Sequence, residues 1–185
     1  MSMSKQEKVV AALIKYTSPL SPFISLEEFE EQREQWYVGL DADDVDILLN
    51  LLVEGPSPTR FDLQDIEEVG TVAVEAIAGF AHRTGVNLLP KILSRLKDFN
   101  NFLHIIELLG MLGQPEVLPV LMRLYTTKNL NHAEMISLFW AIGETRSPEA
   151  VGVLMKIKES LSNNPELKEK IDIVLTEIAQ GRWLQ

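Results

Sequence analysis

The chain has 185 residues, a hydrophobic fraction of 46%, no cysteine and a formal net charge of −10 at pH 7. This length and composition indicate a globular protein with a sizeable core and argue against wholesale disorder. No apolar run reaches the roughly 18–20 residues that a membrane span needs, and the first eight residues do not resemble a secretory signal. The absence of cysteine excludes disulfides and thiolate metal sites. We therefore expect a cytoplasmic protein without a membrane partner.

The net charge is concentrated in the first part of the chain. Residues 1–80 hold 16 acidic and 5 basic side chains, whereas residues 81–185 hold 11 acidic and 12 basic ones. A field dominated by carboxylates repels phosphate groups and disfavours nucleic acid as a ligand. Acidity also serves solubility, and that simpler explanation stays open.

Helix-start signals appear early in the chain. Ser25 with Glu28 makes a capping-box pattern that predicts a helix of about residues 26–39. The acids of residues 41–44 predict the first turn of a second helix, which runs through Val53. Apolar residues recur here at spacings of three and four, which is the period of a helix.

The next break is Gly55-Pro56-Ser57-Pro58, a sequence that ends a helix. Asp62 can then cap a long helix that runs to about His82, and Thr84-Gly85 closes it. The remaining breaks are as short as this one. We expect nine or ten helices joined by loops of two to seven residues, which is the spacing of stacked antiparallel hairpins.

Later helix starts carry proline or asparagine. Pro115 and Pro148 are each followed by glutamate, and we expect each proline to occupy a first helical position. Asn131 with Glu134 suggests another cap. Asn163-Asn164-Pro165-Glu166 predicts the start of the last helix.

The chain repeats itself at a spacing of about 30 residues. A slide of 33 residues pairs Gly110 with Gly143, Pro115 with Pro148, Glu116 with Glu149, Val120 with Val153, Leu121 with Leu154, Met122 with Met155 and Arg123 with Lys156. A slide of 29 residues pairs Ala81 with Gly110, Pro90 with Pro119 and Leu93 with Met122. Three apolar columns follow the same frame: Val74, Leu103 and Ile136; Ile77, Ile106 and Phe139; Phe80, Leu109 and Ile142. Self-similarity of this kind is typical of a helical repeat protein.

Each column has a physical interpretation. The small residues Gly110 and Gly143 end a first helix, and we expect them where the chain turns tightly against the second helix of the hairpin. The apolar columns are where one hairpin stacks on the next, because a lone hairpin cannot bury its face. Nearly every residue of 135–142 is apolar, as expected for a helix covered on both sides.

This pattern resembles the HEAT-like repeats of bacterial scaffold proteins and of the phycobilin lyase family. The resemblance covers residues 70–161 well, and residues 41–54 and 166–180 more loosely. It implies an all-α fold: a right-handed α-solenoid of stacked antiparallel hairpins over residues 61–185, with an acidic helical cap over residues 1–60. The repeat indicates little about function, because proteins with such repeats have many different activities.

Three functions fit the resemblance. The first is a non-catalytic protein-binding module or scaffold whose partner is another protein. The second is a chaperone-like lyase subunit that holds a tetrapyrrole, and the third is a helical-repeat protein that binds nucleic acid. The sequence offers no catalytic triad, phosphate loop or HExxH string, so we expect no enzyme activity and no cofactor.

Two surfaces are candidates for partner binding. Lysines and arginines recur on the second helices of the hairpins and could form a basic strip: Lys91, Arg95, Lys97, Arg123, Lys128, Lys156 and Lys158. Cations are also favoured near helix C-termini, which explains several of them without a partner. The rival surface is the acidic face of the predicted helix 26–39, formed by Glu27, Glu28, Glu30, Glu31 and Glu34.

Other candidates have simpler explanations. His104 and Glu107 lie three residues apart, a spacing that metal sites use, but no further ligand follows and we expect a surface pair. The aspartates of residues 41–46 lack the glycine and the terminal glutamate of a calcium loop. We expect Trp36 to pack within the N-terminal cap. Trp183 either folds back as a C-terminal cap or stays free as an anchor.

Overall fold

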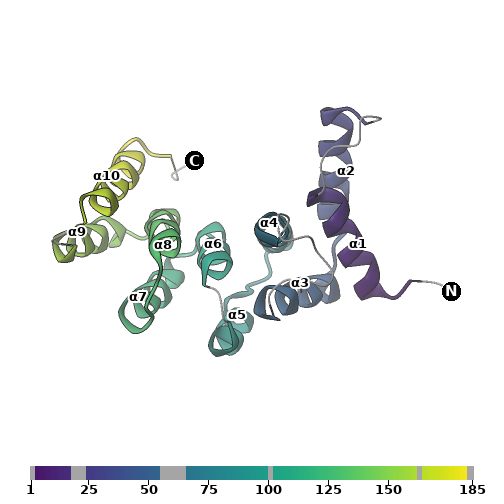
Figure 1. The fold of residues 1–185 in the computed structure, drawn as a ribbon, viewed down its shortest axis with the longest axis horizontal. Helices are drawn as coiled ribbons and strands as arrows, with labels where there is room; N and C mark the ends of the chain where they lie inside the picture. The colour runs from purple at the N-terminus through teal and green to yellow at the C-terminus, as the bar shows by residue number, and fades with distance from the viewer. Residues whose placement is uncertain (1–2, 18–23, 55–65, 100–101, 162–163, 183–185) are drawn as a thin grey trace. The chain divides into compact units, whose positions relative to one another are not determined.

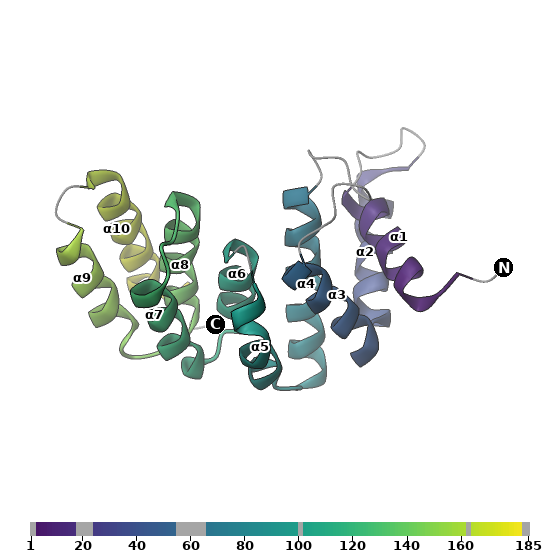
Figure 2. The same ribbon diagram turned by 60° about the horizontal axis from the view of Figure 1, so that its bottom comes forward.

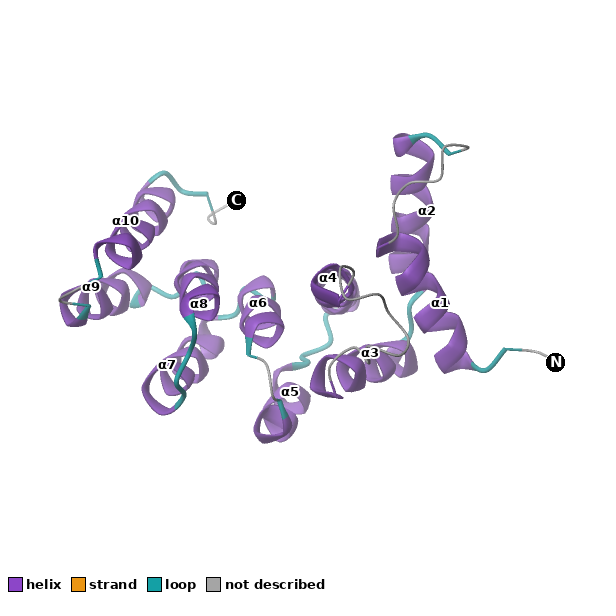
Figure 3. Cartoon of the chain, in the orientation of Figure 1, coloured by secondary structure: helices purple, strands orange, loops and turns teal. Residues whose placement is uncertain are grey.

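The computed structural model describes residues 3–17, 24–54, 66–99, 102–161 and 164–182. Every regular element in this part of the chain is helical, which confirms an all-α protein (Figure 3). The α-helices are α1 (Lys5–Thr17), α2 (Leu26–Gly39), α3 (Ala42–Glu54), α4 (Ile66–Thr84), α5 (Leu89–Arg95), α6 (Leu103–Met111), α7 (Leu118–Thr127), α8 (His132–Glu144), α9 (Ala150–Ser160) and α10 (Pro165–Ala179). Two 3-10 turns, η1 (Leu96–Asp98) and η2 (Pro115–Val117), accompany them.

The predicted caps begin three of these helices. The Ser25 hydroxyl accepts a hydrogen bond from the Glu28 amide at the start of α2. Asn131 and Glu134 form a complete capping box at α8, in which each side chain accepts from the other residue's amide. At α10 the Asn164 side chain accepts a hydrogen bond from the Leu167 amide. Side chains thus satisfy amides that have no partner within their helices.

Local signals also account for the ends of α3 and α4. The Asp41 side chain accepts from the amides of Asp43 and Asp44, which places acids at the start of α3 as predicted. Gly85 closes α4 with a positive φ of 70° and an amide bond to the carbonyl of Ala81. The predicted break at residues 55–58 and the predicted cap at Asp62 lie outside the described residues.

Helix packing divides the chain into two compact units, residues 1–104 and 105–185. In the first unit, α4 packs against α1, α2 and α3, and α1 packs against α3 (Figure 1). Leu48 and Leu49 of α3 and Ile77 of α4 are completely buried. The boundary predicted between residues 60 and 61 lies outside the described residues, and α4 joins the helices that precede it.

In the second unit, α8 is the central helix. It packs against α7, α9 and α10, and α9 packs against α10 (Figure 2). Leu138, Phe139 and Ile142 of α8 are completely buried, which agrees with the expectation that this apolar segment is covered on more than one side. Burial of such side chains is the main source of stability for packed helices.

The turns after α6 and α8 share a backbone arrangement with a 33-residue offset. The Gly113 amide bonds the carbonyl of Gly110, and the Arg146 amide bonds the carbonyl of Gly143. Both residues have positive φ, 62° for Gly113 and 55° for Arg146. The 33-residue sequence repeat therefore corresponds to a repeated backbone turn.

The structure corrects two details of the predicted hairpins. Pro115 opens the 3-10 turn η2, while α7 begins at Leu118 and α9 begins at Ala150, two residues after Pro148. The first hydrogen bonds after these prolines run from residue i to residue i−3, as in the bond from the Val117 amide to the Gln114 carbonyl. A short 3-10 turn thus precedes the regular helix.

The second correction concerns Gly110. A Cβ on Gly110 would lie 2.8 Å from the Cα of Ala141 and 2.5 Å from Oε2 of Glu144, both in α8. The tight approach is therefore to the first helix of the next hairpin, and not to the second helix of its own hairpin. The small residue serves the stacking of α6 on α8.

Candidate functional site

The predicted acidic face lies fully exposed on α2. Its five glutamates, which we call the α2 acidic face, are all exposed: Glu27, Glu28, Glu30, Glu31 and Glu34. None of them forms an ion pair with a described residue. Two apolar side chains at the ends of the helix, Leu26 and Val38, are 60% and 55% exposed. The face combines uncompensated negative charge with apolar side chains.

The opposite side of α2 attaches the helix to the rest of the first unit. The indole of Trp36 stacks on the Tyr16 ring of α1, with 5.4 Å between ring centroids. The Tyr37 hydroxyl donates to Glu75 of α4 at 2.9 Å, and Arg83 donates to the carbonyls of Tyr37 and Leu40. Trp36 is thus a packing residue, as expected, and none of these contacts uses a glutamate of the α2 acidic face.

Tyr37 remains neutral in this environment. Burial raises the pKa of its hydroxyl above the ordinary range, and the negative charge of Glu75 raises it further. The hydroxyl therefore stays protonated at neutral pH and donates to the Glu75 side chain. This hydrogen bond fixes the orientation of the α2 acidic face on the first unit.

The aspartates at the start of α3 have structural roles. Asp41 pairs with Lys5 of α1 at 2.6 Å, and the hydrogen bond from Lys5 lowers the pKa of the Asp41 carboxyl. Asp46 pairs with Lys91 and lies 3.8 Å from Arg95. No group of three potential metal ligands exists among the described residues.

Three of the seven cations of the basic strip, Lys91, Arg95 and Lys158, lie within ion-pair distance of acids of neighbouring helices. Lys91 pairs with Asp46, and Arg95 also donates to the side-chain carbonyl of Asn50 at 2.6 Å. Lys158 pairs with Asp172 of α10. Arg123 and Lys156 are exposed and form no ion pair with a described residue. These two side chains therefore keep their charge available.

The histidines occupy three different environments. The Nε2 of His132 lies 3.1 Å from Glu166 of α10. The half-buried imidazole of His104 occupies the space where a Cβ on Gly70 would lie, so it is a packing residue as much as a surface one. His82 is exposed near the end of α4.

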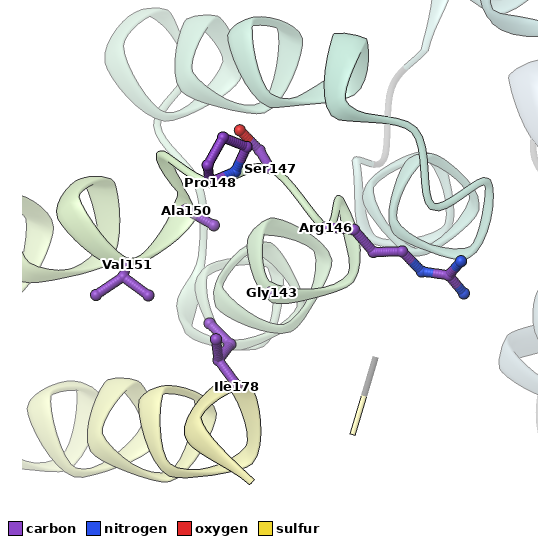
Figure 4. Close-up of a pocket in the computed structure, with 7 residues that line it drawn as sticks. All are labelled: Gly143, Arg146, Ser147, Pro148, Ala150, Val151 and Ile178. Carbon is purple, nitrogen blue, oxygen red and sulfur yellow. The ribbon is translucent and has the colours of Figure 1, made fainter. Parts of the chain in front are cut away.

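A cavity of about 300 Å³ lies where α8, α9 and α10 meet in the second unit. Its lining is mostly apolar and comprises Gly143, Arg146, Ser147, Pro148, Ala150, Val151 and Ile178. Figure 4 shows Val151 and Ile178 on one side of Gly143 and the extended side chain of Arg146 on the other. The Ser147 hydroxyl already bonds Glu149 at 3.0 Å.

A second cavity, of about 510 Å³, lies in the first unit between α1, α2 and the start of α3. Its lining comprises Lys5, Lys8, Val9, Ala12, Trp36, Gly39, Leu40 and Asp44. Lys5 is engaged by Asp41. This cavity mixes both signs of charge and indicates no particular ligand.

Sequence reasoning did not single out Arg146 or the cavity beside it. The signal was present, since the 33-residue slide places Arg146 on Gly113. A glycine replaced by arginine in a repeated turn is a departure from the repeat. Trp183, which was expected to be either a C-terminal cap or a free anchor, lies outside the described residues.

Comparison with known proteins finds no matching family model, no matching curated protein and no matching solved structure. The HEAT-like resemblance therefore rests on the repeat itself. Within the described residues, none of the helices combines the length and apolar character that a membrane span requires.

Proposed function

We propose that this chain is a non-catalytic protein-binding module of HEAT-like type, and that the α2 acidic face binds a basic segment of its partner. One observation carries the proposal: α2 presents five exposed glutamates without an ion-pair partner, between exposed Leu26 and Val38. Steering by such a face raises the association rate, and apolar side chains at its ends supply area for burial.

The proposed architecture is a right-handed solenoid of stacked hairpins with the α2 region as its cap. Support comes from the shared turns after α6 and α8, and from the packing of α8 on α10 in the second unit. A repeat protein of this kind offers extended surfaces for partners and needs no catalytic residue. The basic strip is the weaker candidate surface, because Asp46 and Asp172 neutralise several of its cations.

The test compares three forms of the protein in capture experiments from cell extract. One form is the parent, one carries Glu27→Lys, Glu30→Lys and Glu34→Lys, and the third is a control of equal charge change. The control reverses three exposed glutamates of the second unit: Glu116, Glu159 and Glu169. We expect a basic protein to be retained by the parent and the control and lost by the α2 variant.

The captured protein is then used in stopped-flow binding experiments at low and high salt. We expect the α2 variant to associate at least tenfold more slowly than the parent at low salt, and the difference to shrink at high salt because ions screen the charges. Equal, salt-independent rates would reject the proposal. Visible absorbance after mixing with a bilin would favour the lyase function, and a salt-dependent shift of labelled DNA would favour nucleic-acid binding.

A further inference from the structure

An apolar stripe on α9 is exposed, although its counterpart on α7 is covered. The 33-residue repeat pairs Leu118 with Val151 and Met122 with Met155. Leu118 is 4% exposed and Met122 is half-buried, whereas Val151 is 39% and Met155 is 52% exposed. The positions that both helices turn to the core are buried alike: Leu121, Leu124, Leu154 and Ile157. The main difference in burial therefore lies in one stripe, whose residues are four apart and share a side of the helix.

The next helix along the chain covers this stripe on α7 more completely than on α9. Tyr125 extends the α7 stripe by about one turn, and its hydroxyl lies 2.9 Å from the Ser160 hydroxyl of α9. Its counterpart on α9, Lys158, pairs with Asp172 of α10. Thus α10 contacts the last turn of the α9 stripe, and the first two turns stay exposed. Exposed apolar side chains in a stack of helices supply area on which a further helix can pack.

Exposed cations lie beside the α9 stripe. Arg123 of α7 and Lys156 of α9 occupy the same position of the repeat, and neither forms an ion pair with a described residue. We call Arg123, Val151, Met155 and Lys156 the α7–α9 face. One exposed acid, Glu159, lies on the same side of α9. The two cations outnumber this acid, so the α7–α9 face is locally positive in a chain of net charge −10.

The α2 acidic face has the complementary character. Its five glutamates are exposed and form no ion pair with a described residue, and exposed Leu26 and Val38 lie at the two ends of the helix. Residues 26–38 span about 18 Å of helix, whereas neighbouring packed helices lie about 10 Å apart. One α2 helix is therefore long enough to lie across both α7 and α9.

From these observations we infer that the partner of the α2 acidic face is a second copy of this chain, bound through its α7–α9 face. Glutamates of α2 pair with Arg123 and Lys156, and an apolar end of α2 packs on Val151 and Met155. The inference rests on the proposed protein-binding function and names its partner. The chain itself supplies both charges of the contact, which is why a second copy is a suitable partner. Because the two faces are different surfaces, the contact is heterologous and joins copies head to tail.

The net charge of the protein sets the conditions of the test. Two chains of net charge −10 repel each other at long range, and in about 0.1 M salt this repulsion is screened beyond about 10 Å. Ion pairs at contact distance still attract in that buffer, and about 1 M salt weakens them. We expect the parent to associate at about 0.1 M salt with a Kd on the order of 0.1 mM, because each exposed pair contributes little. Sedimentation velocity of the full chain over a range of concentrations measures this association.

Two charge-reversed variants identify the faces. The α2 variant carries Glu27→Lys, Glu30→Lys and Glu34→Lys, and the α7–α9 variant carries Arg123→Glu and Lys156→Glu. Each variant alone should associate about tenfold more weakly than the parent, because like charges then meet at the contact. An equimolar mixture of the two should associate again, since the unchanged α2 of one meets the unchanged α7–α9 face of the other.

Matched controls separate the contact from net charge. Lys8→Glu with Lys97→Glu changes the net charge as the α7–α9 variant does, at exposed positions outside both faces. This control should associate like the parent. Glu159→Lys removes the one acid beside the cations and should strengthen association. All these substitutions are at exposed positions, so each variant should unfold thermally close to the parent.

Four outcomes would overturn the inference. These are a parent that stays monomeric at the highest concentration, equal association of the parent and both reversed variants, a mixture of those variants that stays monomeric, and an α7–α9 variant that associates as tightly as its matched control. If a monomeric parent captures a basic protein through the α2 acidic face, the proposed function holds and this inference fails. If reversal of α2 changes neither capture nor self-association, both fail.

Discussion

The turns after α6 and α8 have the same backbone but different residues. In both, an amide three residues after a buried glycine bonds that glycine's carbonyl, and in both the residue that donates has positive φ. The first turn uses Gly113 there and the second uses Arg146. The repeat thus preserves a hydrogen-bonding pattern, whereas the residue that occupies it varies.

The residues that precede the turns differ as well. Met111 of α6 is 38% exposed, while its counterpart Glu144 of α8 is half-buried beside Gly110. Burial raises the pKa of the Glu144 carboxyl; the charge of Arg182 opposes this shift and that of Glu107 adds to it. The second turn therefore carries two features that lower stability, a strained arginine and a partly desolvated acid. Features that lower the stability of the folded state are often found at functional sites.

The largest expected effect comes from the contact that joins the two hairpins. Gly110→Val places side-chain atoms where α8 already lies, 2.8 Å from the Cα of Ala141. Because backbone cannot yield as easily as a side chain, we expect a loss of about 1–3 kcal/mol in the free energy of unfolding. Chemical denaturation followed by circular dichroism measures it.

The matched control is Gly152→Ala on α9, where a Cβ would meet nothing within 4 Å. That variant should be as stable as the parent or more stable, because alanine favours a helix over glycine. If Gly110→Val unfolds at the same denaturant concentration as the parent, α6 does not pack on α8 through this glycine.

The local parts of the fold were the predictable ones. The caps at Ser25, Asn131 and Asn164 depend on residues within four positions of one another, so sequence reasoning placed them correctly. The neighbour of Gly110 could not be predicted in this way, since it depends on how α6 packs on a helix 30 residues further along. The same limit explains why the repeat correctly placed Gly110 near the end of α6 but assigned its close contact to α7, whereas the structure shows that contact with α8.

The candidate surfaces show the same division. Exposure of the α2 acidic face follows from one helix and its periodicity, and the structure agrees. The pairing of Lys91 with Asp46 depends on where α5 lies relative to α3, which no local pattern encodes. Similarly, the cavity beside Arg146 requires three helices to meet. Local sequence therefore identified the charged side chains of both candidate surfaces, whereas tertiary packing determines which of them are left without an ion-pair partner.

A reciprocal pair of substitutions tests whether the two turns are equivalent. We expect these two variants to show the next largest changes in the free energy of unfolding. Gly113→Ala should lower the free energy of unfolding by about 1–2 kcal/mol, because a Cβ is unfavourable at positive φ. The loss is due to the backbone, since a Cβ there would lie 3.6 Å from its nearest neighbour, an ordinary contact.

Arg146→Gly should change stability in the opposite direction. Relief of strain is partly offset by the greater entropy of glycine in the unfolded chain, so we expect a gain of about 0.5–1 kcal/mol. Denaturant midpoints of both variants, compared with that of the parent, provide the measurement. Loss of stability in Arg146→Gly would mean that the arginine side chain stabilises the turn and that the two turns are not equivalent.

The smallest expected effect concerns Glu144 and its dependence on pH. Because the folded-state pKa is raised above that of the unfolded chain, the native state holds this proton more tightly. Stability is therefore favoured at pH values below the ordinary glutamate pKa and falls as pH rises through the raised value.

Glu144→Gln removes that fall and should increase the free energy of unfolding at pH 7 by about 0.5 kcal/mol. Denaturation of parent and variant from pH 4 to pH 7 should show curves that converge at the acidic end and separate toward neutrality. Met111→Gln, at the exposed counterpart, should give a constant difference over the same range. A Glu144→Gln curve that runs parallel to the parent would show that the charge of Arg182 fully offsets the desolvation of this carboxyl. Residue 144 would then contribute no more to the pH dependence of stability than residue 111 does.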